Sequence, residues 1–393
     1  MIDPFLAEWL NILVRWGHLV AGISWIGTSF YFVALDLSLR KAAAMPEGVA
    51  GEAWEVHGGG FYHVRKYLSA PAELPPHLIW FKWEAYLTWI TGFALLIIQY
   101  YIAADVYLID PSVLMLNSWQ AIGISVASLL AGWIIYDALC RSPIGKNTAW
   151  LAICVYVLIV AAAYFFAHVF SGRGAFIHVG AFVGTIMAAN VFAVIIPNQR
   201  KITESLLKGE KPDPKYGVIG KQRSTHNTYL TLPVLFMMTS NHYAIITGHP
   251  QAWAIVGLIV LIGGLARYFL LRHEVGDEMS EIAWTIPIMG LCLAGVVMLT
   301  QPQTISYTGP KVSDAEAFSI VQNRCTACHS ANPTDDKIKQ APKGIMFSSL
   351  DDMKKYSKQI DAQAVRHTTM PMANKTHMLP EERAKLGAWI AAQ

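Results

Sequence analysis

Apolar residues occur in long uninterrupted runs along the first 300 residues of the chain. Eight of these runs approach the length of about 20 apolar residues that a helix needs to cross a lipid bilayer. They are Leu10–Leu35, Leu78–Ile102, Trp119–Leu139, Ala149–Phe170, Phe176–Pro197, Tyr229–Ile246, Ala252–Leu271 and Ile282–Leu299. The sixth run is the weakest, because it contains Pro233, Asn241 and His242. The pattern predicts an all-α fold: a polytopic membrane bundle of about eight transmembrane helices.

Lys and Arg residues are unevenly divided between the connections that join these runs. Most of them follow the first, third, fifth and seventh runs. The first basic residues of these four connections are Arg40, Arg141, Arg200 and Arg272. The alternate connections are almost free of basic residues, and residues 171–175 contain only Arg173. Because basic loops stay in the cytoplasm, we expect a multi-pass protein of the bacterial inner membrane with a periplasmic N-terminus and C-terminal domain.

The composition agrees with a membrane protein. Of the 393 residues, 54% are hydrophobic and 15% are charged, whereas soluble domains carry about 25% charged residues. The formal net charge of +3 is too small to imply a polyanionic partner, so we expect no binding to nucleic acid. The partner that the composition does predict is the lipid bilayer.

The chain divides into regions of different polarity. Residues 1–300 contain all the long apolar runs and are expected to form the integral membrane domain. Residues 301–312 contain two prolines and are expected to be a linker. Residues 313–393 are polar and are expected to form a small soluble domain. Of the two long connections, 36–77 has enough aromatic residues to fold, whereas 198–228, with its KGEKPDPKYG sequence, is expected to be solvated.

A sequence for covalent haem attachment lies near the start of the polar region. Cys325 and Cys328 are followed directly by His329 in the pattern C-x-x-C-H, in which two thiols bind haem covalently and the histidine binds its iron. A zinc site would need two further Cys or His ligands in suitable positions, and the neighbouring sequence provides none. The capping box Ser313–Glu316 opens a helix before the motif, and Leu379–Ala392 is expected to form the closing helix. These features predict one haem c.

The second axial ligand of this haem is expected in the segment that follows. The polar domain resembles class I cytochromes c, and TMPMANKTHMLPEERAKLGAWI (369–390) is similar to the loop and last helix that supply their axial methionine. The resemblance implies that Met370 binds the iron opposite His329, and that APKGI (341–345) packs against that histidine. The competing ligands are Met372, His377 and Met378. A Met/His pair raises the haem potential, which suits transfer of electrons to a respiratory acceptor such as a soluble cytochrome c or a terminal oxidase.

Several ionisable residues lie inside the predicted transmembrane helices, where such residues usually face the bundle interior or a cavity. Arg15 and His18 are three residues apart and share one face of the first helix. His168, His178 and His242 lie near the outer ends of their runs by the predicted orientation. One interpretation is a substrate pocket, or a non-covalent haem b held by two of these histidines. The other is that each histidine is a hydrogen-bonded structural residue, and both interpretations are compatible with the sequence.

Other polar or small residues in the runs predict packing between helices. Asp137 and Arg141 are four residues apart near a helix end and are expected to form an ion pair. Gly180 and Gly184 have the spacing that lets two helices approach closely. Asn190 is expected to make a hydrogen bond between helices.

Three segments of the membrane region together resemble one known family. They are RWGHLVAGISWIGTSFYFVALD (15–36), HGGGFYHVRKY (57–67) and VGDEMSEIAWTIPIMG (275–290). The family is the integral-membrane urate oxidase, or urate hydroxylase, of bacterial purine catabolism, in which an eight-helix membrane domain precedes a cytochrome c. The resemblance covers essentially the whole chain. It implies oxidation of urate to 5-hydroxyisourate, with the electrons passed to the haem and on to the respiratory chain.

A urate site needs positive charge for the anion, aromatic faces for stacking and a base for the proton. Arg15, Trp16, His18 and Trp25 supply these residue types on the first helix, so Arg15 and His18 are the candidate catalytic residues. The identity of the substrate rests on the resemblance alone. Two other functions fit the sequence: a quinol–cytochrome c electron conduit, and a transporter whose cytochrome senses the redox state.

Overall fold

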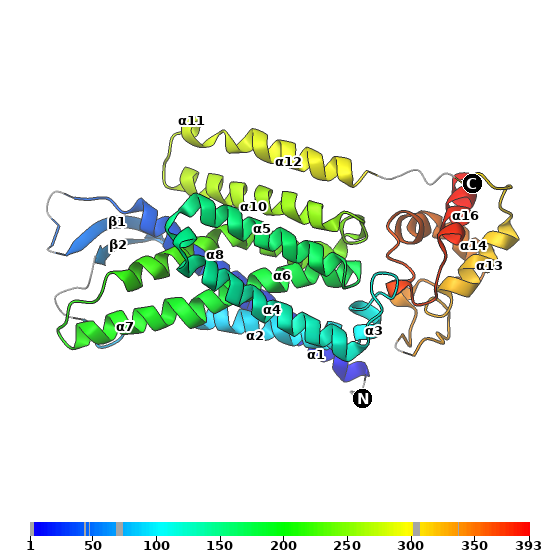
Figure 1. Cartoon of the computed structure of the whole chain (residues 1–393), viewed down its shortest axis with the longest axis horizontal. Coiled ribbons are helices and arrows are strands. Elements are labelled where there is room, and N and C mark those ends of the chain that lie inside the picture. Colours follow the sequence, from blue (N-terminus) through cyan, green and yellow to red (C-terminus); the bar gives the residue numbers. More distant parts are fainter. Residues whose placement is uncertain (1–3, 43–44, 47, 68–73, 302–306, 337) are drawn as a thin grey trace.

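The long apolar runs form long helices that lie roughly side by side in the computed structural model (Figure 1). The structure describes residues 4–42, 45–46, 48–67, 74–301, 307–336 and 338–393. The long helices of the bundle are α1 (Pro4–Ser38), α2 (Trp83–Leu96), α4 (Ser118–Arg141), α5 (Thr148–Ala167), α6 (Gly172–Ala189), α7 (Ile196–Leu207), α8 (Lys215–Thr239), α10 (Ala252–Glu274) and α12 (Thr285–Leu299). A smaller helical unit lies beyond one end of this bundle.

Short helical segments continue or join the long helices. They are η1 (Ile97–Tyr101), α3 (Ala104–Tyr107), η2 (Pro143–Lys146), η3 (Asn190–Ile195), η4 (Ser240–His242), α9 (Ala244–Thr247) and α11 (Met279–Ile282). The π-helical segment η3 continues α6 into α7, and only residues 208–214 separate α7 from α8. Most of the connection expected over 198–228 is therefore helical, although its residues up to Lys221 are largely exposed to solvent, as expected. The polar residues there lie on helices, because α7 packs against α8 and needs only one apolar face.

Six helices in the described part of the chain are long and apolar enough to cross a membrane. They are α1, α4, α5, the continuous helix Gly172–Leu207, α10 and the segment Met279–Leu299. The other two predicted runs also lie in helices, namely α2 with η1 and the second half of α8. Both helices include polar residues, such as Gln99 in η1 and Arg223 in α8, which lower their mean hydropathy. The mostly helical fold is confirmed, while eight membrane crossings stay a prediction.

Helix α6 lies at the centre of the bundle, where it packs against α4, α5 and α8. Small residues make these contacts close. Gly132 of α4 lies directly against the ring of Phe182. A Cβ atom at Gly180 would lie 3.1 Å from that of Met237 on α8, and one at Gly184 would also contact α8. The prediction that Gly180 and Gly184 serve helix packing is confirmed.

An antiparallel hairpin, β1 (Val49–His57) and β2 (Gly60–Tyr67), forms at one end of the bundle. Its turn is Gly58–Gly59, with φ of +57° and +82°, the left-handed region that a two-residue hairpin turn needs and that glycine adopts without strain. Trp54 stacks on His63 across the strands, with ring centroids 4.3 Å apart. The all-α prediction was wrong for this segment, whereas the expectation that part of it folds is confirmed. We call this end of the bundle the hairpin end.

A second hydrophobic core lies within residues 307–393, which we call the C-terminal unit. Its helices are α13 (Asp314–Cys325), η5 (Pro342–Gly344), α14 (Leu350–Lys355), α15 (Ser357–Ile360), η6 (Asp361–Arg366), η7 (Met372–Asn374) and α16 (Pro380–Ala391). The hydroxyl of Ser313 accepts a hydrogen bond from the backbone of Glu316 (3.2 Å), which is one of the two bonds of the predicted capping box, so Ser313 caps α13. Leu386 and Trp389 are buried, which confirms the closing helix. Of the predicted linker, residues 302–306 lie outside the described residues.

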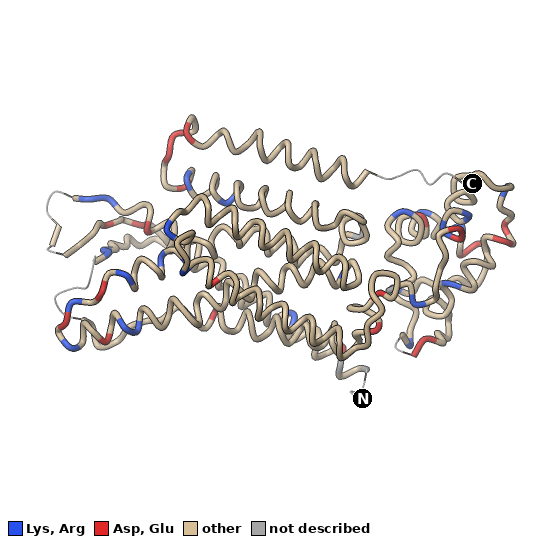
Figure 2. The backbone as a smooth tube through the Cα atoms, in the orientation of Figure 1, with Lys and Arg blue, Asp and Glu red and all other residues tan. Residues whose placement is uncertain are grey.

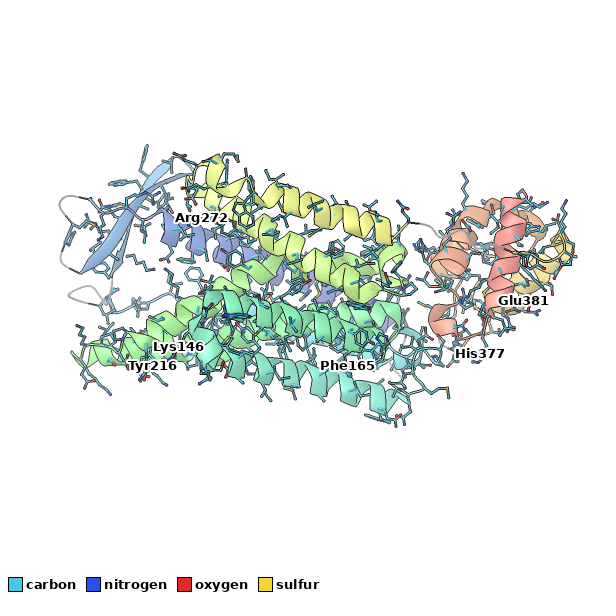
Figure 3. The ribbon with its side chains drawn as sticks, turned by 45° about the horizontal axis from the view of Figure 1, so that its top comes forward. Lys146, Phe165, Tyr216, Arg272, His377 and Glu381 are labelled. Atoms are coloured by element: carbon cyan, nitrogen blue, oxygen red, sulfur yellow. The ribbon has the colours of Figure 1, made fainter. Side chains whose placement is uncertain are left out.

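The C-terminal unit lies at the end of the bundle opposite the hairpin, which we call the capped end (Figure 1). The contacts include α3 with η7, and Gly248, between α9 and α10, lies against the backbone of His367. Figure 2 shows that most Lys and Arg residues of the bundle gather at the hairpin end. In Figure 3, Lys146 and Arg272 lie at that end, whereas Glu381 lies in the C-terminal unit. The charge asymmetry expected from the sequence is therefore an asymmetry between the two ends of the bundle.

Candidate active site

One large cavity joins the interior of the bundle to the C-terminal unit. Its volume is about 830 Å³, within the range of pockets that hold cofactors and small molecules. The bundle contributes walls from α1, α2, η1, α6 and α8, and the C-terminal unit contributes Cys325, Cys328, His329 and Met370. The fold thus brings His18, from near the start of the chain, into the same cavity as the C-x-x-C-H motif.

His18 on α1 is held by two threonines of α2. Its Nδ1 lies 3.0 Å from the carbonyl oxygen of Thr88 and 3.1 Å from the hydroxyl of Thr91. A carbonyl oxygen can only accept a hydrogen bond, so Nδ1 carries the proton and the lone pair of the neutral ring is on Nε2. Gly92 permits the approach, because a Cβ atom there would lie 2.9 Å from Cε1 of His18. The ring therefore has a proton-accepting nitrogen, Nε2, without a hydrogen-bond partner among the described residues.

Arg15 lies almost one turn before His18 on α1 and also lines the cavity. Its Nη2 donates to the side-chain oxygens of Asn11 (3.1 Å) and Gln99 (3.0 Å). Both acceptors are neutral amides, so they orient the guanidinium without cancelling its charge. Of the described bundle residues that line the cavity, none is Asp or Glu. This part of the cavity therefore attracts an anion.

Aromatic side chains form much of the cavity wall between α1, α2 and α6. Trp89 and Phe93 are stacked, with ring centroids 5.2 Å apart and an interplanar angle of 7°. The indole Nε1 of Trp89 donates to the hydroxyl of Thr185 on α6 (3.1 Å), which fixes the ring. Trp25 and Tyr100 also line the cavity. Flat faces of this kind suit a planar heterocycle.

The other three histidines predicted on this side take different positions. His178 on α6 is buried, with Nε2 2.7 Å from the hydroxyl of Ser125 and Nδ1 2.7 Å from the carbonyl oxygen of Gly174. His168 is exposed, and its Nδ1 lies 2.8 Å from a carbonyl oxygen of its own helix, α5. His242 is exposed and lines the cavity. This geometry favours a structural role for His178 and leaves His242 as the histidine that shares the cavity with His18.

The C-x-x-C-H motif extends the last turn of α13. The backbone N–H groups of Cys328 and His329 both donate to the carbonyl oxygen of Cys325, at 3.2 and 2.8 Å. Nδ1 of His329 donates to the carbonyl oxygen of Ile345 (2.9 Å), which leaves the lone pair of Nε2 available to a metal. The expectation that the 341–345 loop packs against this histidine is confirmed. Burial raises the pKa of the Cys325 thiol to about 12 and also raises that of Cys328.

The structure separates the four candidates for the second axial ligand. Met370 and Met372 both line the cavity, whereas His377 does not. Met378 is buried in the hydrophobic core of the C-terminal unit. The carbonyl oxygen of Met370 accepts a hydrogen bond from Nη1 of Arg383 (2.7 Å), which fixes the backbone at this position. The cavity therefore retains Met370 and Met372 as the two thioethers that a bound group can reach.

The residues present fit a covalent haem. Two thiols, an imidazole with an available Nε2 and the thioethers line one cavity, and apolar residues such as Ile345 and Phe347 line it beside them. In the described residues there is no group of three or more His, Cys, Asp and Glu side chains that could hold a metal ion. A closed zinc site would need such a group. Two thiols beside an imidazole are the residue types that a covalent haem needs, so the residues present fit one.

A buried polar network lies between the cavity and the hairpin end. Asn227 lines the cavity, and its Oδ1 accepts a hydrogen bond from Asn190 of η3 (2.9 Å). Further along, Asp137 pairs with Arg141 (2.6 Å), as predicted, and with Arg223 of α8 (2.7 Å). Arg223 is only 1% exposed, so it is the partner that Asp137 holds inside the bundle. The sequence did not identify this partner, because the two residues lie on different helices.

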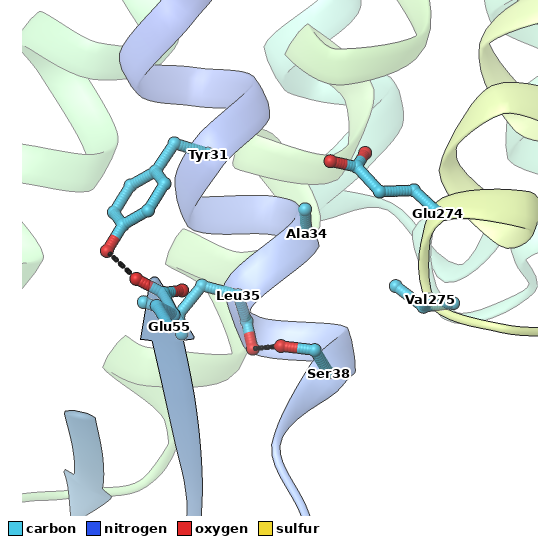
Figure 4. A pocket seen from close by; sticks show the side chains of 7 residues that line it. All are labelled: Tyr31, Ala34, Leu35, Ser38, Glu55, Glu274 and Val275. Atoms are coloured by element: carbon cyan, nitrogen blue, oxygen red, sulfur yellow. Dashed lines mark hydrogen bonds between the residues drawn. The ribbon is translucent and has the colours of Figure 1, made fainter. Parts of the chain in front are cut away.

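A smaller cavity of about 180 Å³ lies at the hairpin end (Figure 4). The hydroxyl of Tyr31 donates to Oε2 of Glu55 on its wall (2.6 Å), and the carboxylate of Glu274 lies on the other side. The described lining of this cavity contains two carboxylates and no cation. Its charge is therefore opposite to that expected of a site for an anion.

Among the polar residues that line the large cavity, sequence reasoning gave no role to Gln99, Arg173 and Asn241. Arg173 appeared only as the single basic residue of an otherwise bare connection. Asn241 appeared only as a weakness of the sixth run. The signal common to all three is a polar residue in or beside an apolar run, which is costly unless it faces the interior or a cavity.

The bundle region of the chain matches a known protein family. Residues 4–300 match the sequence model of the family described as Urate oxidase N-terminal. No curated protein and no solved structure gave a significant match to the chain.

Proposed function

Since the chain belongs to the Urate oxidase N-terminal family, we propose that it is a membrane-bound, cytochrome c-linked urate oxidase. In this proposal the protein oxidises urate to 5-hydroxyisourate in purine catabolism. The electrons pass to a covalently attached haem c and on to the respiratory chain. The observation that carries the proposal is the single cavity shared by Arg15, His18 and the C-x-x-C-H motif.

The distribution of apolar and basic residues supports an orientation in the membrane. Six helices of the described chain have the length and hydropathy to cross a bilayer. The basic residues gather at the hairpin end, and basic loops stay in the cytoplasm. The C-terminal unit then lies in the periplasm, the compartment in which bacteria attach haem c.

The charge and shape of the cavity support urate as the substrate. Urate is planar and is a monoanion at neutral pH. Arg15 supplies positive charge where the described bundle wall has no carboxylate. The stacked pair of Trp89 and Phe93, together with Trp25, supplies flat apolar faces against which the purine can lie.

The geometry of His18 supports its role as the general base. Conversion of the urate monoanion to neutral 5-hydroxyisourate removes two electrons and adds the oxygen and one hydrogen of a water molecule. The other hydrogen of that water leaves as one proton. Nε2 of His18 accepts this proton, because Nδ1 already carries one and donates it to the carbonyl oxygen of Thr88. Thr88 thus keeps the imidazole in the tautomer that a base requires.

The C-terminal unit provides the residues that would hold the haem. Cys325 and Cys328 would form the two thioether links, and His329 and Met370 would bind the iron. A haem at this position supplies a one-electron acceptor at the capped end of the bundle. The hydrogen bond from His329 to Ile345 fixes the imidazole plane and strengthens it as a ligand. The proposal requires one haem only, so it does not depend on a haem b held by other histidines.

Anaerobic mixing of the detergent-solubilised protein with urate tests the proposal. We expect the haem to become reduced and one 5-hydroxyisourate to form for every two electrons delivered. A haem that stays oxidised with urate but is reduced by a quinol would overturn the proposal in favour of an electron conduit. Urate uptake into proteoliposomes without haem reduction would favour a transporter.

A pyridine haemochrome spectrum tests the cofactor separately from the activity. We expect the spectrum of a single c-type haem per chain. Replacement of both Cys325 and Cys328 by serine should abolish covalent attachment, so that haem no longer stays with the denatured chain. A b-type spectrum from the unmodified protein would show that the bundle histidines hold a second haem.

A further inference from the structure

A second set of polar residues, Tyr100, Asn241 and Arg173, lines the large cavity. Neither Arg15 nor His18 makes a hydrogen bond to any of these three residues. Tyr100 is 3% exposed and lines the cavity. Its hydroxyl oxygen accepts a 2.7 Å hydrogen bond from Nδ2 of Asn241. Tyr100 belongs to η1 and Asn241 to η4, so this bond ties two distant segments together near the capped end.

The other end of the Asn241 amide is unsatisfied. Its Oδ1 is buried and has no hydrogen-bond partner within the described residues. Buried amide oxygens are nearly always hydrogen-bonded. The Tyr100 hydroxyl fixes the orientation of the amide, so Oδ1 has a defined position beside the cavity and accepts a hydrogen bond from a donor that is not part of the described chain.

Arg173 is the second member of this set. It is the second residue of α6 and lines the same cavity. Its Nε is buried and, like Oδ1 of Asn241, has no partner among the described residues. Helix α6 packs against η4, the segment that carries Asn241, and Arg173, Asn241 and Tyr100 all line the same cavity. The cavity beside the buried ring of Tyr100 thus offers a positively charged donor, Nε of Arg173, and a neutral acceptor, Oδ1 of Asn241.

We propose that Arg173 and Asn241 bind the substrate anion, with Tyr100 as the residue that positions Asn241. This inference rests on the proposed function. The edges of a urate anion alternate between carbonyl oxygens, which accept hydrogen bonds, and ring N–H groups, which donate them. Arg173 donates Nε–H to the anion and neutralises its charge, and Oδ1 of Asn241 accepts a ring N–H. Arg15 then adds to the positive charge of the cavity, and His18 is left for the proton transfer.

Two pairs of variants test the proposal on the full-length protein in detergent. The first pair is Arg173→Gln and Arg173→Lys, and the second is Asn241→Ala and Asn241→Asp. The dissociation constant of urate is measured by equilibrium dialysis on protein reduced with dithionite, so that no turnover occurs. KM and kcat are measured with ferricyanide as the electron acceptor.

We expect Arg173→Gln to raise both the dissociation constant and KM roughly ten- to hundredfold, the range for loss of a charged hydrogen bond. Its kcat should change little, and Arg173→Lys should recover part of the affinity because it restores the charge. Asn241→Asp has the shape of the natural residue but adds a negative charge. It should therefore bind urate more weakly than Asn241→Ala, which a merely structural role would not produce.

Arg272→Gln is the matched control, since Arg272 lies at the hairpin end in an ion pair with Asp277. It should bind urate like the unmodified protein. Normal affinity in both Arg173→Gln and Asn241→Asp would overturn the inference. If Arg173→Gln does not fold, the order of the two Asn241 variants decides. Failure of the unmodified protein to oxidise urate would instead overturn the proposed function, so the two failures are distinguishable.

Discussion

The backbone of Gly248 lies directly against the carbonyl oxygen of His367, so that a Cβ atom at position 248 would overlap it. Gly248 belongs to the bundle, and His367 precedes the Met370 segment of the C-terminal unit. A backbone approach this close requires glycine. The contact lies at the capped end, where the large cavity passes from one unit to the other. The close contact between the C-terminal unit and the bundle therefore requires a residue without a side chain at position 248.

Replacing Gly248 by leucine should push the C-terminal unit away from the bundle and slow the reduction of its haem by urate. The rate of this transfer depends on the distance and orientation of the two units, so we expect a severalfold slowing. Single-turnover stopped-flow absorption of the haem measures the rate. Gly264→Leu is the matched control, because a Cβ atom at Gly264 on α10 meets open space. Equal rates in both variants would show that the contact does not control the transfer.

His18→Asn separates the two nitrogens of the imidazole. The Asn side chain offers an N–H group close to the position of Nδ1, so it can still donate to the carbonyl oxygen of Thr88. It has no nitrogen that can act as a base. We expect kcat for urate to fall by about 10²- to 10⁴-fold, the usual contribution of a general base, with little change in urate affinity. His168→Asn, at an exposed position outside the cavity, should keep the normal kcat.

The helices could be predicted from the sequence because long apolar runs leave few alternatives. Their ends could not, since a helix continues through polar residues as long as its backbone hydrogen bonds are made. Helix α1 begins at Pro4 and α8 at Lys215, both well before the apolar runs that revealed them. The hairpin was missed although Gly58–Gly59 between two aromatic segments is a recognised turn signal.

The candidate site was predictable only where its residues are close in sequence. The C-x-x-C-H motif is continuous, and Arg15 and His18 share a face through helical spacing. Arg173 and Asn241 come from two other segments, and their approach to Tyr100 depends on how the helices pack. The sequence also left open whether His178 binds a cofactor, because its partner Ser125 lies on α4. Such relationships are set by tertiary contacts that no local pattern contains.

Met370 and Met372 can be distinguished as iron ligands by a pair of alanine variants. The backbone of Met370 is fixed on both sides, by the carbonyl oxygen of Gln363 (3.0 Å) and by Arg383 (2.7 Å). We expect Met370→Ala to lose the near-infrared absorption of a methionine–iron bond and to lower the reduction potential of the haem. Met372→Ala should change neither property in a spectroelectrochemical titration. The reverse pattern would assign the ligand to Met372.

The stability of the C-terminal unit should fall at acidic pH through Asp314. The indole of Trp389 (2.9 Å) and the ammonium group of Lys354 (3.1 Å) donate to its carboxylate. These hydrogen bonds hold the pKa of Asp314 below its ordinary value in the folded protein. The stabilisation is therefore complete above the ordinary aspartate pKa of about 3.9 and is lost as the pH falls through the lower folded value. Hydrogen exchange of peptides from α13 and α16 measures this loss.

Asp314→Asn lacks the negative charge that binds Lys354 and Trp389, so that variant should be less stable at neutral pH. It should also lack the acid-dependent increase in exchange that the unmodified protein shows. Peptides from α6 serve as an internal control, because they lie in the bundle, far from Asp314. An equally steep increase in the variant would show that another carboxylate dominates the acid response.

The position of the cavity and the distribution of basic residues predict the side of the membrane from which urate reaches the cavity. In the proposed orientation the hairpin end is cytoplasmic, because the basic residues gather there. The cavity meets the C-terminal unit at the opposite end, where His242 is exposed. Urate and ferricyanide cross bilayers poorly. We therefore expect intact right-side-out vesicles to oxidise external urate with external ferricyanide. Intact inside-out vesicles should do so only after permeabilisation with detergent.

Equal activity of both preparations after permeabilisation is the control that they contain the same amount of enzyme. Proteolysis of the C-terminal unit from outside, followed by release of a haem-containing fragment, identifies the right-side-out vesicles independently of activity. Activity that appears in both preparations only after permeabilisation would mean that urate enters beside the hairpin, past Asn190 and the ion pair of Asp137 and Arg223, while ferricyanide reacts at the opposite end. That route would require the buried network to open during turnover, since Arg223 is almost completely enclosed.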